Sequence, residues 1–242
     1  MSLAGDLKIL YHLTLAPVRG KTHAERLENF YRGQASEYDR FRDRLLPGRN
    51  ELFASLSARE GTVWIDMGAG TGSNALLLGD RIQRLGSMYL VDLSPSLLHR
   101  ARLRIEERGW DNVRAFEADA TRFQPFETAV DVVTFSYSLT MIPDWYAAID
   151  RAWELLRPGG TIGVVDFFVS RKYPAAERRQ HSWFTRHFWP AWFGFDGVHL
   201  HPDHLPYLER RFATVSVHES YASVPYLPGA RVPYYRYIGK KR

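Results

Sequence analysis

The stretch that decides the fold runs Thr62-Val-Trp-Ile-Asp66-Met-Gly68-Ala69-Gly70-Thr-Gly72. Its first five residues form a short apolar run that predicts a buried strand, and the glycines predict a sharp turn that a ligand can approach closely. Residues 73–84, which follow, are predicted to be helical. Because free N–H groups at a helix N-terminus favour negative charge, this strand–turn–helix unit indicates a cofactor site.

Outward from this unit, strands and helices alternate with short links. Ser94 is a suitable N-cap and Pro95 a suitable first residue for the helix after the second strand. The predicted strands are 62–66, 87–92, 113–117, 130–136 and 161–168, and the predicted helices between them are 73–84, 95–108 and 144–156. This alternation predicts parallel strands joined by right-handed crossovers, a doubly wound α/β sheet.

The flanking segments break this pattern. The predicted elements there are helices 23–45, 49–58, 174–187 and 202–211, and closing strands 212–223 and 231–239. We find no repeat and no low-complexity linker. We therefore expect a single domain over residues 1–242, with a helical cover (1–60), a cofactor-binding core (61–168) and a substrate- and membrane-facing extension that includes the closing strands (169–242).

Composition excludes several classes of site. The 242 residues include no cysteine, which excludes disulfides, thiol nucleophiles and Cys-ligated zinc, and which suits a cytoplasmic location. No stretch approaches the roughly 20 apolar residues of a membrane-spanning helix. The net charge of +5 is uneven, because residues 61–166 carry 10 basic and 14 acidic side chains whereas residues 167–242 carry 12 basic and 5 acidic ones.

The basic C-terminal part is also rich in aromatic residues, since residues 167–242 hold 17 of the 34 aromatic side chains. Cationic and amphipathic aromatic side chains together suit a membrane interface, so an anionic membrane surface is the predicted partner, bound peripherally. The alternative is an aromatic core patch beneath a solvated basic rim.

Acidic residues near the strand ends favour S-adenosylmethionine over NAD. Asp92 ends the second strand, 20 residues after Gly72, where a carboxylate can accept both ribose hydroxyls. Asp66 precedes the glycines, where a carboxylate would repel a pyrophosphate but suits the amino group of a methionine moiety. Asp119 and Ala120 follow the third strand and are placed to bind adenine.

These motifs, with Asp131-Val-Val-Thr-Phe-Ser136 and Leu156-Arg-Pro-Gly-Gly160, resemble the class I S-adenosylmethionine-dependent methyltransferases over residues 60–168. The resemblance implies a Rossmann-like sheet of order 3-2-1-4-5-7-6 with an antiparallel last strand. It also implies a cover that closes over the cofactor through Tyr31 and Tyr38. The cofactor-binding residues that it implies are Tyr31, Asp66, Gly68, Ala69, Gly70, Gly72, Asp92, Leu93, Asp119, Ala120, Ser136 and Met141.

A narrower resemblance lies outside this core. The segments Thr22–Tyr31, His181–Pro190, Pro202–Glu209 and Val224–Pro228 resemble the methyltransferase of betaine-lipid synthesis. That resemblance implies trimethylation of the amine of diacylglyceryl-homoserine, a lipid headgroup substrate and an upstream aminocarboxypropyl transferase that supplies it. The alternative is a methyltransferase of the same fold that acts on a soluble amine or a quinone.

An attacking amine must be neutral, so a nearby proton acceptor would help. The candidates are Tyr38, Tyr137, Asp166 and His181, and the sequence does not choose among them. Trp183, Arg186 and Trp189 are candidate substrate-binding residues, because aromatic faces bind alkylammonium cations and an arginine suits a carboxylate. The neighbouring Phe184, Phe188, Trp192 and Phe193 could also line a slot for acyl chains or belong to the core.

Two further hypotheses come from other function classes. His199-Leu-His201-Pro-Asp203-His204 matches a metallo-hydrolase pattern, but only 38 residues follow it and Pro202 suggests a helix start inside it, so we predict no metal. The pI of about 9.4 also suits a nucleic-acid modifier. Ser136-Tyr-Ser-Leu lacks the Asn/Asp-Pro-Pro-Tyr/Phe signature of many base-amino methyltransferases, so we predict no nucleic-acid partner.

Overall fold

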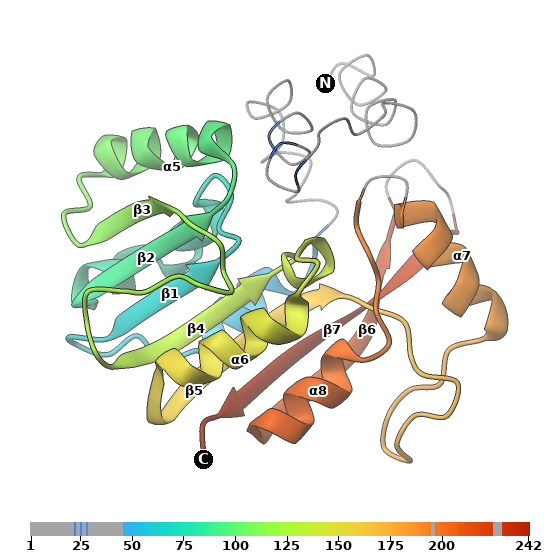
Figure 1. The fold of residues 1–242 in the computed structure, drawn as a ribbon. Helices are drawn as coiled ribbons and strands as arrows, with labels where there is room; N and C mark the ends of the chain where they lie inside the picture. Colours follow the sequence, from blue (N-terminus) through green and yellow to red (C-terminus); the bar gives the residue numbers. More distant parts are fainter. Residues whose placement is uncertain (1–21, 23–24, 26–27, 29–45, 195–196, 225–228) are drawn as a thin grey trace.

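A computed structural model describes residues 22, 25, 28, 46–194, 197–224 and 229–242. Its centre is a seven-stranded sheet of order β3-β2-β1-β4-β5-β7-β6 (Figure 1). The strands are β1 (Val63–Met67), β2 (Ser87–Asp92), β3 (Val113–Glu117), β4 (Val130–Ser136), β5 (Leu156–Phe167), β6 (Ala213–Ser223) and β7 (Arg231–Lys240). Strands β1 to β5 pair in parallel, and β7 runs antiparallel to both β5 and β6. The predicted fold class and strand order are therefore confirmed.

Helices cover both faces of the sheet. They are α4 (Arg49–Ser55), η1 (Ser73–Arg84, a 3-10 helix), α5 (Pro95–Arg108), η2 (Leu139–Met141, also 3-10), α6 (Trp145–Leu155), α7 (Trp183–Gly194) and α8 (His204–Arg211). One hydrophobic core lies under α4, η1, α5 and α7, and a second lies under α6 and α8, which cross in front of the sheet in Figure 1. No helix among the described residues has the length and apolar character needed to cross a bilayer.

The helix α5 shows how local sequence sets an element. Ser94 Oγ accepts a hydrogen bond from the N–H of Leu97, and Pro95 begins the helix. Gly109 ends it in the left-handed conformation, with φ of +60°. The predicted bounds of this helix are therefore confirmed at both ends.

The predicted helix at 174–187 is wrong in its position. The structure places no helix in residues 174–182, which are irregular apart from a turn at 176–177, and α7 begins only at Trp183, where Ser182 Oγ accepts from the N–H of Thr185. The alanine- and arginine-rich segment has good helix propensity, but tertiary contacts override it. His181 bonds Ser170 through both its ring and its main chain, and Gln180 Nε2 donates to the Lys172 carbonyl, so the chain folds back on itself.

The segment Arg157-Pro-Gly-Gly160 also differs from its prediction as a helix stop ahead of the fifth strand. α6 already ends at Leu155 and β5 begins at Leu156, which pairs with Val130 across a register shift, so the segment lies within β5. The predicted division into cover, core and extension stays an interpretation. Most of the predicted cover, including the helix at 23–45, lies outside the described residues.

Candidate active site

The glycine turn forms a tight loop at the carboxyl end of β1. Gly68, Gly70 and Gly72 have φ of +72°, +58° and +70°, a region that residues with a Cβ rarely adopt. A Cβ on Gly68 would lie 2.4 Å from Ser138 Cβ, and one on Gly72 would lie 2.8 Å from Leu90 Cδ1. Backbone freedom and close packing therefore both require glycine, and the loop lies directly against the segment that follows β4.

Asp92 links this loop to the start of α5. Its Oδ2 accepts from the N–H of Gly70 at 2.8 Å and its Oδ1 accepts from the N–H of Ser94 at 2.9 Å. Glu28 of the cover accepts from Ser94 Oγ and from both the N–H and Oγ of Ser96. The carboxylate thus lies beside the glycine loop, as a ribose-binding role requires, although that role stays a prediction.

Asp66 is fully buried and belongs to a polar network within the sheet. Its Oδ1 accepts from Thr134 Oγ1 at 2.7 Å and its Oδ2 accepts from Asn74 Nδ2 at 2.9 Å. The buried guanidinium of Arg49 donates to Asn74 Oδ1, and Ser136 Oγ lies 3.5 Å from the same oxygen. Asp66 therefore orients Asn74 at the base of the loop, and its predicted contact with a methionine amino group stays a prediction.

Sequence reasoning missed Arg49, Asn74 and Thr134 in this network. Asn74 could have been found, because it lies two residues beyond the last glycine of the loop, whereas Arg49 and Thr134 are brought in only by the tertiary fold. Next to Asn74, the Oγ of Ser73 is buried and has no hydrogen-bond partner among the described residues. An unsatisfied hydroxyl at the start of η1 fits a loop that takes a polar ligand.

The remaining predicted cofactor residues occupy the same edge of the sheet. Asp119 is exposed and its Oδ1 accepts from the N–H and Oγ1 of Thr121, while Ala120 is buried. Leu93, Ser136 and Met141 follow or end β2, β4 and η2. Because parallel strands end at one edge, these residues lie toward the same edge as the glycine loop, and their contacts with S-adenosylmethionine stay predictions. Tyr31 and Tyr38 lie outside the described residues.

Tyr137 follows β4 and has an unusual backbone. Its φ of +54° makes it the one described non-glycine residue with a positive φ. Its hydroxyl donates to the Pro47 carbonyl at 2.7 Å, and burial raises its pKa well above the usual range, with Asp166 adding to the effect. A phenol that already donates and resists ionisation is a weak proton acceptor, so this geometry favours a positioning role while the catalytic one stays a prediction.

Asp166 near the end of β5 is completely buried on the face covered by α6 and α8. Burial raises its pKa to about 7, in spite of the hydrogen bonds from Thr140 and from the N–H of Phe167. Its contacts with Thr140 Oγ1 (2.8 Å) and N–H (3.2 Å) hold η2 against the sheet. The carboxylate of Asp166, a predicted proton acceptor, is thus hydrogen-bonded to η2, the helix that follows Ser138 beside the glycine loop.

His181 is buried between Phe168 and Tyr221. Its Nδ1 accepts from the N–H of Ser170 at 2.9 Å, so the neutral ring carries its proton on Nε2, which is buried without a partner among the described residues. Burial, with a smaller contribution from Arg179 and Arg186, lowers its pKa to about 4. The nitrogen that could accept a proton is therefore occupied, and the predicted catalytic role of His181 stays untested.

The aromatic residues of α7 connect the surface to the end of β4. Neighbouring ring centroids lie between 4.7 and 5.8 Å apart along a series that we call the aromatic ladder. Its members, in order, are Phe184, Phe188, Trp189, Phe193, Phe167 and Tyr137. Phe184 is 62% exposed, whereas Tyr137 is 6% exposed, so the ladder runs from solvent into the core.

The three predicted substrate residues differ widely in exposure. Trp183 is 68% exposed and stacks on His187, whereas Trp189 is 4% exposed and packs in the core. Arg186 is partly buried, and its Nε has no partner among the described residues. Their roles as substrate contacts stay predictions, and all three lie in the first part of α7.

The histidines at 199–204 belong to different elements. The N–H of His199 donates to the Thr140 carbonyl, and His204 begins α8, where its ring packs against Trp145 and His201. Among the residues that the structure describes, no group of three or more His, Cys, Asp or Glu side chains is arranged to hold a metal ion. The metallo-hydrolase hypothesis therefore gains no support from the described part of the chain.

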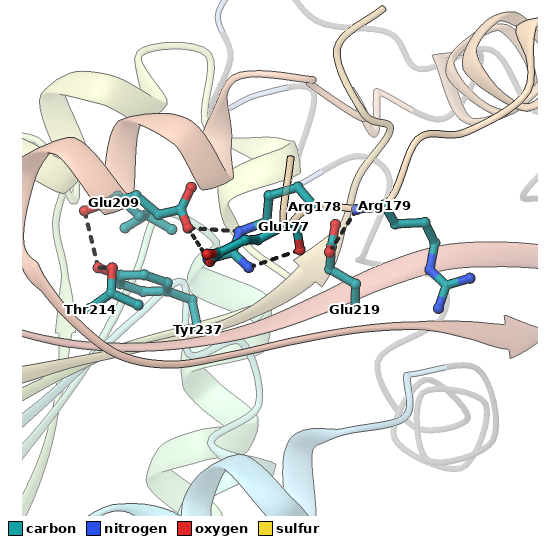
Figure 2. Close-up of polar contacts among 8 residues, drawn as sticks. Glu177, Arg178, Arg179, Glu209, Thr214, Glu219 and Tyr237 are labelled. Atoms are coloured by element: carbon teal, nitrogen blue, oxygen red, sulfur yellow. Dashed lines mark hydrogen bonds and ion pairs between the residues drawn. The ribbon is translucent and has the colours of Figure 1, made fainter. Parts of the chain in front are cut away.

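A small pocket of about 100 Å³ lies away from the glycine loop, between the chain that follows β5, α8 and Glu219 of β6. Figure 2 shows Arg178 turned toward Glu209, to which its Nε donates at 2.8 Å, beside Glu219, whose Oε2 accepts from the N–H of Arg179. The ion pair raises the pKa of the Arg178 guanidinium. These contacts attach the segment 174–182 to α8 and β6.

Comparison with known protein families supports the enzyme class and the cofactor that the sequence predicts. A model of the ubiE/COQ5 methyltransferase family matches residues 20–193 of the 242. The chain belongs to the ubiE/COQ5 methyltransferase family. The predicted enzyme class and cofactor are thereby confirmed, because this family consists of S-adenosylmethionine-dependent methyltransferases. The matched region begins in the predicted cover and ends at Phe193, within the aromatic ladder.

Curated relatives of this family are similar over part of their length. The chain is 26% identical over 162 residues to the ubiquinone/menaquinone biosynthesis C-methyltransferase UbiE of Azotobacter vinelandii, covering 64% of each protein. It is 24% identical over 152 residues to the demethylmenaquinone methyltransferase of Lactococcus lactis, covering 60% of each. The chain thus spans less than two thirds of these relatives. Neither name supports the narrower resemblance to the betaine-lipid enzyme.

Solved structures show the same fold at low identity. The N-methyltransferase NodS of Bradyrhizobium japonicum, in complex with S-adenosyl-L-homocysteine, aligns with a TM-score of 0.64 and 15% identity, covering 88% of this chain and 97% of that one. A putative methyltransferase of Bacillus halodurans aligns with a TM-score of 0.63 and 17% identity, covering 80% and 98%. These similarities confirm the Rossmann-like methyltransferase fold.

Proposed function

We propose that this protein transfers the methyl group of S-adenosylmethionine to a ring carbon of a quinone precursor that carries an apolar tail. The observation that carries the proposal is the family match over residues 20–193, together with relatives named for ubiquinone, menaquinone and demethylmenaquinone. The aromatic ladder lies inside that region and adds support, because a row of aromatic rings suits a planar acceptor with an apolar chain.

When bound, the cofactor supplies an activated sulfonium methyl group, so the protein has mainly to align the acceptor and exclude water. In this proposal Asp92 and the glycine loop hold the cofactor. The Asp66–Asn74 contact fixes the base of that loop, and the last ladder residues, Phe167 and Tyr137, close the site from the apolar side. The buried rings at this edge provide the dry surroundings that such a transfer requires.

A second candidate is N-methylation of a lipid headgroup amine, of which the betaine-lipid precursor is the narrower case. The observation that favours it is also the ladder, because methylated ammonium groups bind aromatic faces by roughly 0.5–2 kcal/mol per contact. An attacking amine must be neutral, whereas α-amino groups titrate at about 7.7–8.0, so this candidate predicts a rate that rises with pH near neutrality. Methyl transfer to a quinone ring carbon requires no deprotonation of an ammonium group, so the first proposal does not predict this rise of the rate with pH.

The test is the mass of the product. The purified full chain is given S-adenosylmethionine in detergent micelles with one acceptor at a time: reduced demethylmenaquinone, diacylglyceryl-homoserine or a soluble amine. A single added methyl on the reduced quinone supports the first proposal. Methylation of the lipid amine alone would replace it with the second candidate, and equal turnover of the soluble amine would contradict both.

A further inference from the structure

Exposed aromatic side chains occur at the start of α7 and in the segment that leads into it. Tyr173, Trp183 and Phe184 are 77%, 68% and 62% exposed. Gln180 Nε2 donates to the Lys172 carbonyl at 2.8 Å, so the chain folds back between the residue before Tyr173 and the residues that lead into α7. Burying such side chains would be favourable, and their clustering in one segment indicates a surface that is covered in use.

Positive charge accompanies these rings. Residues 171–187 contain five basic side chains and one acidic one. Arg171 and Arg178 are paired with Asp203 and Glu209, so their charge is partly balanced. Lys172 and Arg179 are exposed, and their side chains lie over aromatic rings, Lys172 over Tyr173 at 5.1 Å and Arg179 over Tyr221 at 5.3 Å.

Figure 2 shows the difference between the two neighbouring arginines. The side chain of Arg178 reaches back to Glu209, whereas Arg179 bonds Glu219 only through its main-chain N–H and extends its guanidinium away from that carboxylate. Arg231 also lies over the Tyr221 ring, at 5.6 Å, which adds a further cation beside Arg179. We call Lys172, Tyr173, Arg179, Trp183 and Phe184 the basic–aromatic surface.

We propose that the basic–aromatic surface docks on an anionic lipid bilayer, with Trp183 and Phe184 at the depth of the headgroups and Lys172 and Arg179 against the lipid phosphates. Tryptophan is favoured at that depth because its ring is apolar and its N–H is polar. Basic side chains are attracted to an anionic leaflet, and the attraction is screened by salt. Charge complementarity therefore selects an anionic bilayer as the occupant.

The docking surface continues into the interior along the aromatic ladder, because Phe184 belongs to both. A bilayer-embedded acceptor that enters beside α7 would meet apolar rings all the way to Tyr137, at the edge where the glycine loop lies. This route rests on the proposed function, whereas the docking itself depends only on the surface. The two can therefore fail separately in experiment.

The experiment is flotation of the purified full chain with vesicles of phosphatidylcholine alone or mixed with phosphatidylglycerol. We expect binding to the anionic vesicles that weakens with added salt. The double variant Trp183→Ser/Phe184→Ser should bind the anionic vesicles at least about tenfold more weakly than the wild type. The double variant Lys172→Glu/Arg179→Glu should lose the part of the binding that weakens with added salt. Phe126→Ser is the matched control, because Phe126 is 74% exposed but lies in the link after β3.

S-adenosylmethionine affinity reports whether each variant is folded. Absence of binding to anionic vesicles, equal binding to both vesicle types, or an equal loss in Phe126→Ser would overturn the docking proposal. If the wild-type chain binds anionic vesicles and loses binding in the double variant but methylates none of the lipid acceptors, the docking stands and the proposed function falls.

Discussion

The hydroxyl of Tyr137 donates a 2.7 Å hydrogen bond to the carbonyl of Pro47, which joins the end of β4 to the residues just before α4. The ring also packs edge-on against Phe167, with centroids 4.7 Å apart. The contact therefore fixes a residue with a positive φ at the inner end of the aromatic ladder. Strained backbone of this kind persists only where surrounding contacts hold it.

Replacing Tyr137 with Phe should remove this contact and leave the Pro47 carbonyl unsatisfied. We expect the free energy of unfolding to fall by about 1–2 kcal/mol, measured by urea denaturation. Tyr146→Phe is the control, because Tyr146 is 49% exposed and its change should have little effect. Since the phenol donates and its pKa is raised, methyl transfer should persist, and loss of all activity in a folded variant would restore Tyr137 as the catalytic base.

Replacing Gly68 with Ala should disrupt cofactor binding. The added Cβ would meet Ser138 Cβ at 2.4 Å, which the loop can relieve only by moving. Gly61→Ala is the matched control, because Gly61 has a similar φ of +75° but no atom within 4 Å of its added Cβ. Calorimetry should show loss of S-adenosylmethionine affinity in the first variant and near wild-type affinity in the second. Equal effects would mean that backbone strain, and not the contact with Ser138, is what matters.

Asp92→Ala should weaken S-adenosylmethionine binding by roughly 1–3 kcal/mol, because a charged acceptor is lost beside the loop. The same change removes the acceptor for the N–H groups of Gly70 and Ser94, so the loop is loosened as well. Asp80→Ala, at an exposed position on η1, is the control. Unchanged affinity of Asp92→Ala in calorimetry would contradict the ribose-binding prediction.

Asp166 should make stability depend on pH. Its pKa is about 7 in the folded state because of burial, against an ordinary value of 3.8, so the folded protein holds a proton that the unfolded chain has released. The resulting stabilisation is complete below about pH 4 and is lost as the pH rises through 7. Urea denaturation should show wild-type stability falling relative to Asp166→Asn by about 2–3 kcal/mol between about pH 5 and pH 8. Parallel curves would refute the raised pKa.

His204 should make stability depend on pH in the sense opposite to Asp166. Burial lowers its pKa to about 3, so the unfolded chain takes up a proton that the folded protein excludes. The stabilisation that depends on neutral His204 is complete above about pH 6.5, and it is lost as the pH falls below that value. His204→Phe should remove about 2 kcal/mol of the loss between about pH 7 and pH 5, and it replaces two ring nitrogens that have no partner among the described residues.

Local pattern predicted the fold well because each element has its own signal. The alternation of apolar runs and helical segments predicted the parallel core, and the resemblance to class I methyltransferases implied the strand order in which β7 lies between β5 and β6. Ser94, Pro95 and Gly109 set the limits of α5 without help from distant residues. Where distant contacts compete with propensity, as in residues 174–182, the prediction placed a helix where the chain is irregular.

The sequence by itself determined that a glycine loop follows β1 and that Asp92 lies near it, because positive φ and strand ends are local properties. Only the tertiary structure decided that both oxygens of Asp66 bond Thr134 and Asn74, and that Arg49 joins them from α4. It also ordered the aromatic residues of α7 and β5 into one ladder and left Trp183 and Phe184 in solvent. The physical reason is that side-chain partners and exposure depend on which elements pack together, which no single segment encodes.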